Sequence, residues 1–354
     1  MATRPRLAAT RRSILRGAPA LAGLWAAGAR AAADLKGKTV VFASWGGAYQ
    51  DAERACYCDP FAAATGARVV QDGPMSIAKF RVMVEGGAPD WDVADVSIDF
   101  LYAGSADHLF EPVDKAIVDT GRIDPRFVHE NGVGCIVWSN NLGYSTAAFP
   151  AGKQPSTWAD LFDLRRFPGK RTLSDEPTAT LELALLADGV PPGKLYPLDV
   201  DRAFRKLDTI RQDTIFWSTN SQCQQLFTDG EVGLGMILNG RAFDAAKKGA
   251  PIAVSWEQNI QSVDYLAVPR GSRNRAAAMR LIDTMTLADN QAKLANLIAY
   301  APTNPAAFES VDKTVEPWLS TAPANVEKGF VINAAYWRDN QKALLERWAA
   351  WKLS

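Results

Sequence analysis

The sequence predicts an α/β protein in which mostly parallel sheets are flanked by helices. Short apolar runs alternate with helix-like segments along the chain, which is the order of strand–helix–strand units in a parallel sheet. The length of 354 residues, 47% of them hydrophobic, suffices for about two domains with large cores. No stretch of roughly 18 consecutive strongly apolar residues occurs, so the composition excludes both a disordered chain and an integral membrane protein.

The first strand–helix–strand units come directly after residue 35. We expect strands at 39–43, 67–70 and 92–96, a helix from Ala48, and a connecting segment at 76–85. Each expected strand is a short apolar run without internal proline, as buried strands usually are. These units predict one group of parallel strands in the first part of the chain.

A second set of units follows residue 141. An amphipathic helix is indicated by apolar residues spaced three and four apart, namely Val200, Ala203, Phe204, Leu207 and Ile210. We expect strands at 233–238, 253–256 and 265–268. The last third is helical, with one apolar stripe at Met279, Ile282 and Met285 and another at Leu344, Leu345, Trp348 and Trp351. No flexible Gly/Ser linker is present, so two domains must be joined by strand-like crossings, near 139–142 and 261–264.

Residues 1–33 have the layout of an export signal. They contain six arginines and no acid, then a weakly apolar stretch, then small residues at 31–33, as in a secretory signal with an A-x-A cleavage site. Residues 10–15 (TRRSIL) resemble a twin-arginine signal, with Ile14 in the usual place of Phe. We expect export to the periplasm, by the twin-arginine or the general route.

The net charge of zero conceals two opposite parts. Without residues 1–33, 33 basic side chains face 39 acidic ones, a net charge of −6, which argues against nucleic acid as a partner. The four cysteines do not form a disulfide framework, and buried free thiols are the favoured interpretation. With only two histidines, His108 and His129, a Cys/His metal site is not expected.

The motifs of common enzyme classes are missing. The chain has no nucleophile elbow, phosphate-binding loop, HExxH sequence or dinucleotide fingerprint. Ser76 and Lys79 match S-x-x-K, but its companion motifs S-D-N and K-T-G are absent. We therefore expect no enzyme and no cofactor. The rival hypothesis, a secreted hydrolase or transferase, requires a nucleophile beside a base.

Four segments carry a family resemblance. They are 44–51 (SWGGAYQD), 155–161 (PSTWADL), 229–240 (DGEVGLGMILNG) and 300–304 (YAPTN). In this order and spacing they resemble the periplasmic spermidine/putrescine-type solute-binding proteins of ABC transporters, the family 1 extracellular solute-binding proteins. The resemblance covers about residues 35–352.

The resemblance implies a type II periplasmic binding protein fold of two α/β lobes, each a mostly parallel sheet flanked by helices. The expected lobes are 35–138 plus 264–302, and 142–260 plus 305–354, with two crossover strands at the hinge. Such a monomer captures a small solute by hinge closure and delivers it to an inner-membrane ABC permease. An extracytoplasmic receptor that signals through a membrane partner is a further alternative.

Several residues match the family's ligand positions. They are Trp45 as an aromatic wall, Asp264 and Glu176 as carboxylates for an ammonium group, and Tyr300 as an aromatic lining residue. Each has a structural alternative: a core position for Trp45 and Tyr300, a solvated strand start for Asp264, and helix capping for Glu176. A polyamine site uses such carboxylates and aromatic faces to bind ammonium groups and methylene chains.

The departures from the polyamine pattern concern the charge of the ligand. Leu238 and Ser262 stand where aromatic residues are usual, and Ala179 replaces a carboxylate. Asp99 occupies an aromatic position. Asn239 is a further candidate ligand residue, and Arg241 follows Asn239 and Gly240 where the family has a small neutral residue.

Arg241 is unsuited to a polycation but suited to a carboxylate or phosphonate, which it can hold with two parallel hydrogen bonds. The backbone N–H groups of Gly46 and Gly47 could assist it. The expected ligand is therefore either polyamine-like or zwitterionic and amino-acid-like, with Asp99 and Asp264 binding the amine. The structural alternative for Arg241 is a salt bridge.

Overall fold

The computed structural model describes residues 35–353, and a mixed β-sheet of 11 strands organises this part of the chain. The strand order is β2-β1-β3-β9-β5-β8-β6-β7, with β10 and β4 paired to β5 and β11 paired to β9. The strands are β1 (Thr39–Ala43), β2 (Arg68–Asp72), β3 (Val93–Ser97), β4 (Val128–His129), β5 (Gly132–Ser145), β6 (Arg171–Ser174), β7 (Thr214–Trp217), β8 (Leu234–Leu238), β9 (Ile252–Ala267), β10 (Ala301–Pro302) and β11 (Gly329–Val331). The predicted export signal, residues 1–33, lies outside the described residues.

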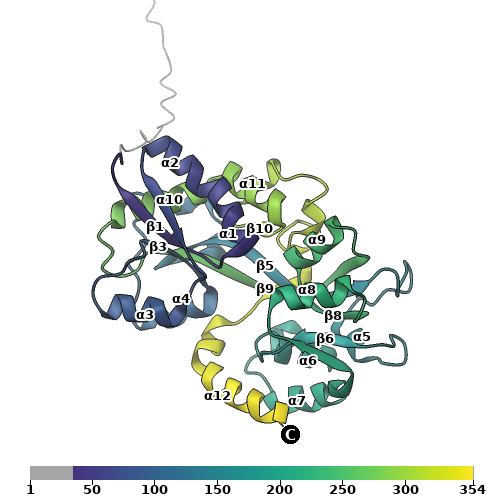
Figure 1. The fold of residues 1–354 in the computed structure, drawn as a ribbon. Coiled ribbons are helices and arrows are strands. Elements are labelled where there is room, and N and C mark those ends of the chain that lie inside the picture. The colour runs from purple at the N-terminus through teal and green to yellow at the C-terminus, as the bar shows by residue number, and fades with distance from the viewer. Residues whose placement is uncertain (1–34, 354) are drawn as a thin grey trace, which may run out of the picture. The chain divides into compact units, whose positions relative to one another are not determined.

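Two long antiparallel strands form the middle of the sheet. β5 and β9 pair from Val133 opposite Leu266 to Ser145 opposite Ile252, with register shifts along the way. On one side β1 pairs in parallel with β2 and β3, and on the other side β6 pairs in parallel with β7 and β8. Figure 1 shows β5 and β9 between these two groups. The sheet is thus parallel within each outer group and antiparallel at its centre.

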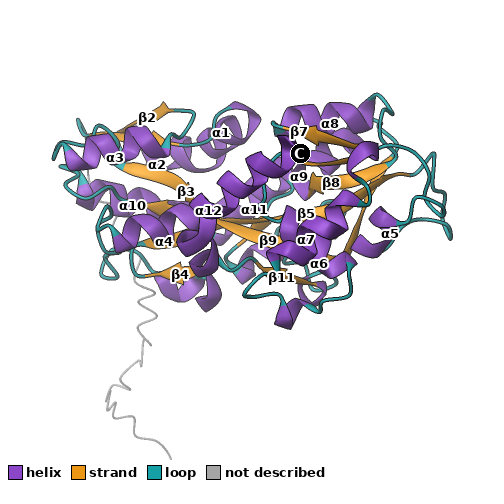
Figure 2. Ribbon diagram, turned by 90° about the horizontal axis from the view of Figure 1, so that it is seen from below, coloured by secondary structure: helices purple, strands orange, loops and turns teal. Residues whose placement is uncertain are grey.

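The helices flank the sheet, and Figure 2 shows them on both sides of the strands. They are α1 (Gly47–Glu53), α2 (Asp59–Thr65), α3 (Ile77–Glu85), α4 (Ile98–Ala106), α5 (Trp158–Phe162), α6 (Thr180–Ala187), α7 (Val200–Asp208), α8 (Asn220–Thr228), α9 (Asn239–Lys247), α10 (Arg275–Met285), α11 (Ala288–Ile298) and α12 (Ala334–Leu353). A π-helical segment, η1 (Arg54–Cys58), joins α1 to α2. The predicted α/β fold is confirmed. None of the helices in residues 35–353 is long and apolar enough to cross a membrane.

Local sequence explains many of these elements. Helix α7 begins where the Asp199 side chain accepts a hydrogen bond from the backbone N–H of Arg202 at 3.0 Å, and it buries Phe204 and Leu207 as predicted. The expected strands at 253–256 and 265–268 are in fact one strand, β9. Periodicity missed this continuity, because polar residues interrupt the apolar pattern. Gln261, Ser262 and Asp264 pair with β5. On the other edge, Asn259 and Gln261 pair with β11, and Asp264 pairs with β3.

The apolar stripe of the C-terminal helix differs from the prediction at one position. Leu344 and Trp348 in α12 are buried, whereas Leu345 is 43% exposed. A rotation of about 100° per residue turns Leu345 away from its neighbour. Trp351 stacks on Phe204 with ring centroids 5.4 Å apart, which fixes the end of α12 against α7.

The proposed division into two lobes remains a prediction. All described residues fall within one compact unit. The expected crossings at 139–142 and 261–264 lie inside β5 and β9, which run through the centre of the sheet. Helix α12 contacts α4, and Trp351 near its end packs on Phe204 of α7, so this helix touches both outer groups of elements.

A buried arginine stabilises the start of β6. Arg171 is fully buried and its guanidinium donates to backbone carbonyls of Leu161 (3.1 Å), Gly169 (2.5 Å), Asp163 (3.4 Å) and Phe167. Replacement by Met leaves these buried acceptors without donors. We expect Arg171→Met to lower the free energy of unfolding by about 3 kcal/mol, measured by urea denaturation. Arg205→Ala, an exposed arginine of α7, is the control and should change stability by less than about 0.5 kcal/mol.

Candidate functional site

A cavity of about 810 Å³ opens at the carboxyl ends of β1, β3, β6, β7 and β8. In α/β sheets ligands bind at such strand ends, because the loops there converge. Many of its lining residues are polar, charged or aromatic. The lining residues include Trp45, Gly46, Tyr49, Asp99, Trp138, Asp175, Glu176, Trp217, Arg241, Asp264 and Tyr300.

Most of the site residues predicted from sequence lie together on this cavity. Those on the lining are Trp45, Gly46, Asp99, Glu176, Arg241, Asp264 and Tyr300. Gly47 and Asn239 are not on the lining. The amide of Asn239 accepts from the backbone N–H of Ser139 (3.0 Å) and donates to the carbonyls of Ala299 (2.7 Å) and Trp318 (2.9 Å). These bonds give Asn239 a structural role, because they tie α9 to the central strand and to two loops.

Asp264 is a buried carboxyl on the cavity wall. It lies inside β9 and is 6% exposed, so it is not a solvated residue at a strand start. Its Oδ1 accepts a hydrogen bond from the indole Nε1 of Trp138 at 2.9 Å. Burial raises the pKa of Asp264, the charge of Asp95 raises it further, and the Trp138 bond opposes the rise. A cation placed beside Asp264 would stabilise its charged form.

Asp99 and Glu176 extend the acidic wall. Asp99 is in the first turn of α4, and Glu176 is exposed in the loop after β6. Partial desolvation raises the pKa of Glu176, with smaller contributions from the charges of Asp99 and Asp175. Asp175 is already paired with Lys352. Among the described residues, neither Asp99 nor Glu176 forms a salt bridge, so both are available to a ligand.

Arg241 faces the same cavity from α9 and has no acidic partner within residues 35–353. Its Nε is buried without a hydrogen-bond partner. The salt bridge that was the alternative interpretation is therefore not formed. Burial raises the pKa of the neighbouring Tyr300 to about 12, against the opposing charge of Arg241. Tyr300 comes this close to α9 because residue 240 is glycine: a Cβ there would lie 2.5 Å from the Tyr300 ring.

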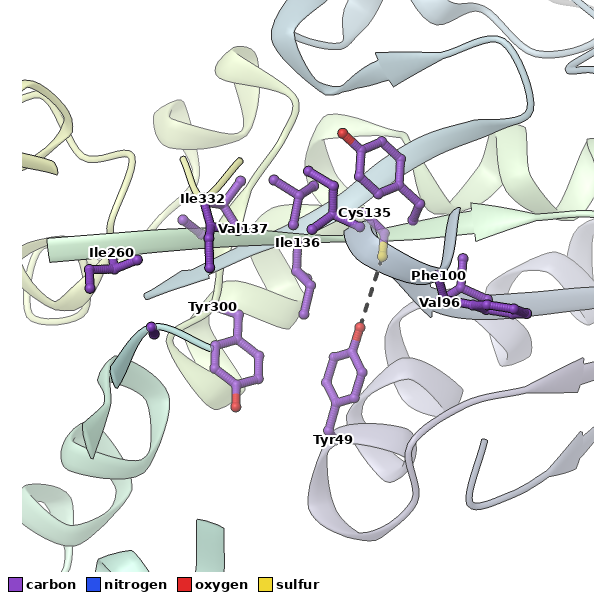
Figure 3. Packing of buried hydrophobic residues seen from close by; sticks show 14 of the residues in the cluster. Tyr49, Val96, Phe100, Cys135, Ile136, Val137, Ile260, Tyr300 and Ile332 are labelled. Atoms are coloured by element: carbon purple, nitrogen blue, oxygen red, sulfur yellow. Dashed lines mark hydrogen bonds between the residues drawn. The ribbon is translucent and has the colours of Figure 1, made fainter. Parts of the chain in front are cut away.

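Aromatic rings form much of the remaining wall. Trp45 is 37% exposed, so it is not a core residue. Tyr300 packs edge-on against Tyr49, with ring centroids 5.7 Å apart, and Figure 3 shows the Tyr49 hydroxyl directed at Cys135. Trp138 and Trp217 also line the cavity. Leu238 and Ser262 stand where polyamine-binding relatives have aromatic residues. Trp138 and Trp217, which were not predicted as site residues, supply aromatic rings to the cavity wall in their place.

Comparison with known proteins decides the family. A sequence model described as "Bacterial extracellular solute-binding protein" matches residues 56–325. The chain belongs to this family of solute-binding proteins. It is 34% identical over 330 residues to the γ-aminobutyric acid-binding protein of Pseudomonas aeruginosa, covering 91% of this chain and 93% of that protein. It is 30% identical over 177 residues to the spermidine/putrescine-binding periplasmic protein of Escherichia coli, covering 48% and 50%.

Solved structures agree with this assignment. The structure titled Atu4243-GABA receptor is 40% identical, with a TM-score of 0.83, and the match covers 89% of this chain and 97% of that one. This solute-binding protein is therefore a periplasmic substrate-binding component of an ABC transporter and not an enzyme.

Metal and disulfide chemistry do not contribute to the described part of this solute-binding protein. Within residues 35–353 no group of three His, Cys, Asp or Glu side chains could hold a metal ion. All four cysteines are buried and free, as predicted. Cys135 donates a hydrogen bond to the backbone carbonyl of Asp264 at 3.2 Å.

Sequence reasoning missed a set of buried polar residues behind the cavity wall. Tyr49 donates a hydrogen bond to Asp95 at 2.7 Å, and Ser44 donates one to Glu53. Asp95 and Glu53 are fully buried. The available signal was Asp95 itself, a carboxylate at the centre of an otherwise apolar strand, since buried carboxyl groups are rare without a partner.

Glu53 makes the stability of this solute-binding protein depend on pH. Burial raises the pKa of Glu53 to about 8 from 4.5, so the folded state holds a proton that the unfolded state releases. The stabilisation is complete below about pH 4.5 and is lost as the pH rises towards 8, by up to about 1.4 kcal/mol per pH unit. We expect Glu53→Gln to flatten this part of the pH profile of unfolding, measured by urea denaturation from pH 5 to 9. An unchanged slope in the variant would contradict the assignment.

Proposed function

We propose that this solute-binding protein captures a small zwitterion of the ω-amino acid type, such as γ-aminobutyrate. Its ammonium group binds at Asp264 and Asp99, and its carboxylate binds at Arg241. The observation that carries the proposal is that Arg241, which forms no salt bridge within residues 35–353 and whose buried Nε has no hydrogen-bond partner, lines the same cavity as carboxylates that form no salt bridge. A zwitterion can place its ammonium group against the carboxylates and its carboxylate against Arg241. A ligand with only a positive or only a negative charge can form one of these two contacts but not both.

The electrostatics of the empty cavity favour this ligand. An isolated charge in a partly desolvated site is costly until a partner neutralises it. Arg241 offers a planar fork that holds a carboxylate by two parallel hydrogen bonds. Asp264 is desolvated, and an ammonium group supplies the missing counter-charge. Each end of the ligand thus relieves an unfavourable charge that the free protein carries.

The comparisons support the same ligand class. The Pseudomonas aeruginosa relative that spans nearly the whole chain is named for γ-aminobutyric acid, and the similar solved structure is titled a GABA receptor. The relative named for spermidine and putrescine matches over about half of the chain. The γ-aminobutyric acid-binding relative thus has the higher identity and the larger coverage of this chain, which favours a zwitterionic ligand.

A polyamine is the second candidate. Four carboxylates and several tryptophan rings line the cavity, and such rings stabilise ammonium groups by about 2 kcal/mol when desolvated. The charge of Arg241 opposes a polycation, because like charges repel strongly in a low-dielectric site. We therefore expect polyamines to bind more weakly than the ω-amino acid.

Isothermal titration calorimetry on the purified mature protein tests the proposal. The ligands are γ-aminobutyrate, putrescine, spermidine, butylamine and butyrate. The last two each keep one charged end of γ-aminobutyrate and serve as matched controls. We expect γ-aminobutyrate to bind at least about 100-fold more tightly than either, since each lost ionic contact costs about 3 kcal/mol. Tighter binding of putrescine than of γ-aminobutyrate would overturn the zwitterion assignment.

Membership of the solute-binding family also indicates how the bound solute is delivered to the transporter. Contacts of one ligand with residues on both sides of the cavity favour a closed conformation, because only differential contacts shift such an equilibrium. The closed monomer then docks on an inner-membrane ABC permease. Reconstitution of the protein with that permease in proteoliposomes should give ATP-dependent uptake of γ-aminobutyrate, and uptake without the binding protein would contradict this role.

A further inference from the structure

Three buried carboxyl groups form a cluster that reaches from the cavity wall into the core. The acidic cluster consists of Asp264, Asp95 and Glu53. Asp264 lines the cavity, whereas Asp95 and Glu53 are fully buried and do not. The ligand-binding role proposed above uses only Asp264, so the two inner carboxyl groups are left without a function.

The fold brings the three groups together from separate elements. In the antiparallel pairing of β3 with β9, Ser97 lies opposite Asp264 and Asp95 lies two residues away. Because side chains alternate along a strand, Asp95 and Asp264 emerge on the same face of the sheet. Helix α1 covers this face and presents Tyr49 and Glu53, which share one side of the helix at a spacing of four residues. The π-helical segment η1 begins directly after Glu53.

Only neutral donors hold the cluster. Trp138 donates to Asp264 at 2.9 Å, Tyr49 donates to Asp95 at 2.7 Å, and Ser44 donates to Glu53. Within residues 35–353 no lysine or arginine forms a salt bridge with any of the three groups, and none is among the main causes of their pKa shifts. Three carboxylates without a cation cannot all be ionised at this depth, since an unpaired buried charge is very costly.

Two buried carboxyl oxygens of the cluster, Glu53 Oε1 and Asp95 Oδ1, lack a hydrogen-bond partner within the described residues. Burial raises the pKa of Asp95, and the charge of Glu53 raises it further. Two neighbouring buried carboxylates without a cation destabilise each other, so protonation of one of them is favoured. The inner pair therefore holds at least one proton in the ligand-free protein.

The surroundings offer no other group that could take this proton at neutral pH. The titratable neighbours of the cluster are Tyr49, Cys56, Tyr57, Cys58, Asp99, Cys135 and Tyr300. Burial raises the pKa of each of these tyrosines and cysteines above its ordinary value, so all six remain neutral. Asp99 is the one carboxyl among these neighbours, and its side chain is partly exposed to the cavity.

We propose that the acidic cluster couples amine binding to proton release: an ammonium group bound beside Asp264 displaces a proton from the carboxyl groups of the cluster into solvent. This inference rests on the proposed amine ligand. The ligand keeps its own ammonium protons. The cluster gains one negative charge as its carboxylic acid becomes a carboxylate, and the proton leaves to the buffer. Asp95 and Glu53 are thus positioning residues that set how strongly the site prefers a cation.

The physical cause is the charge of the ligand. An ammonium group near Asp264 favours the ionised form of all three carboxyl groups, most strongly that of the nearest one. The pKa values of Asp264 and Asp95 are raised in the free protein, first by burial and then by a neighbouring acid. Ligand binding lowers them again, so protons are released and the affinity rises with pH, by up to about tenfold per unit. An alkyl ammonium group itself titrates near pH 10, well above this range.

The number of protons released can be measured directly. Calorimetric titrations of the mature protein with γ-aminobutyrate, in buffers of different ionisation enthalpy at one pH, give it from the slope of the apparent enthalpy. We expect the release of a sizeable fraction of a proton at pH 6 to 7, and an affinity that increases from pH 5 to 8. Infrared difference spectra should show the loss of a protonated carboxyl C=O band on binding. Binding with no proton exchange and no pH dependence overturns the proposal.

Two variants locate the source of the proton. Glu53→Gln keeps the shape and the bond to Ser44 but removes an ionisable group, so it should reduce the proton release at least about twofold while the protein still binds. Asp92→Asn is the matched control: Asp92 is buried and accepts hydrogen bonds from neutral donors, including Val41 N–H at 2.9 Å, but it precedes β3 at the end away from the cavity. Proton release that is lost in the control and kept in Glu53→Gln contradicts the proposal.

The same titrations separate this inference from the proposed function. If γ-aminobutyrate and the polyamines all fail to bind, the amine ligand is wrong and the coupling fails with it. If an amine binds but releases no proton, the proposed function stands and only the coupling is wrong. If Glu53→Gln does not fold, the proton release and infrared measurements on the wild-type protein still decide the question.

Discussion

Asp264→Asn should abolish most of the affinity for any amine ligand. The substitution keeps the size of the side chain and an acceptor for the Trp138 indole, but it removes the buried negative charge. Truncation of one partner of a desolvated charge pair costs about 3 kcal/mol, so we expect a roughly 100-fold loss of γ-aminobutyrate affinity by titration calorimetry. The unfolding free energy of the free protein should stay equal or rise, because a buried acid without a cation is removed.

Asp175→Asn is the control for this substitution. Asp175 lines the same cavity, but its carboxylate is occupied by Lys352 and by the indole of Trp348. We expect a change in affinity of less than about threefold. Equal losses in both variants would show that the general negative potential of the cavity, and not Asp264 itself, binds the amine.

Arg241 should decide between the two ligand classes. Arg241→Ala removes the carboxylate partner and leaves space, so we expect about a 100-fold loss of γ-aminobutyrate affinity. Putrescine has no carboxylate, and its affinity should increase because a repelling charge is gone. Arg241→Lys keeps the positive charge but loses the planar guanidinium. We expect this variant to bind γ-aminobutyrate roughly tenfold more weakly than the wild-type protein.

The decisive observation is that Arg241→Ala changes the two affinities in opposite directions, weaker for γ-aminobutyrate and stronger for putrescine. A general destabilisation of the protein would weaken both ligands, and thermal denaturation of each free variant checks for it. Arg205→Ala, which removes an exposed arginine of α7 far from the cavity lining, should leave both affinities unchanged. Unchanged γ-aminobutyrate binding in Arg241→Ala would refute the proposed carboxylate contact.

Much of the fold could be predicted because its signals are local. The strands at the starts of the two parallel groups and helix α7 follow from apolar periodicity and capping, which depend on residues close in sequence. The long strands β5 and β9 were predicted only in part, as crossings at 139–142 and 261–264 and as short strands at 253–256 and 265–268, because their polar residues break the apolar pattern. Several of those residues pair with a neighbouring strand, and some of them line the cavity.

The candidate site was only partly predictable. Asp264 and Trp45 could be identified because they match ligand positions of a family that the sequence resembles, and Arg241 because it departs from the family at such a position. Trp138 and Trp217 could not, because a tryptophan in a strand has the same local signal whether it faces a core or a cavity. Asn239 belongs to a strongly matching motif, yet its amide holds the backbone and does not line the cavity.

The sequence by itself determined the α/β class, the solute-binding family and the presence of both acidic and basic candidates for the ligand. These depend on composition, local periodicity and the order of motifs along the chain. Only the tertiary structure decided that Arg241 has no acidic partner in the described residues, and that Glu53 and Asp95 stand behind Asp264. The tertiary structure brings together residues that are more than 40 positions apart in the sequence, such as Tyr49 and Asp95. The energies of charged groups depend on their distances in space and on how far water is excluded, and neither can be read from the sequence.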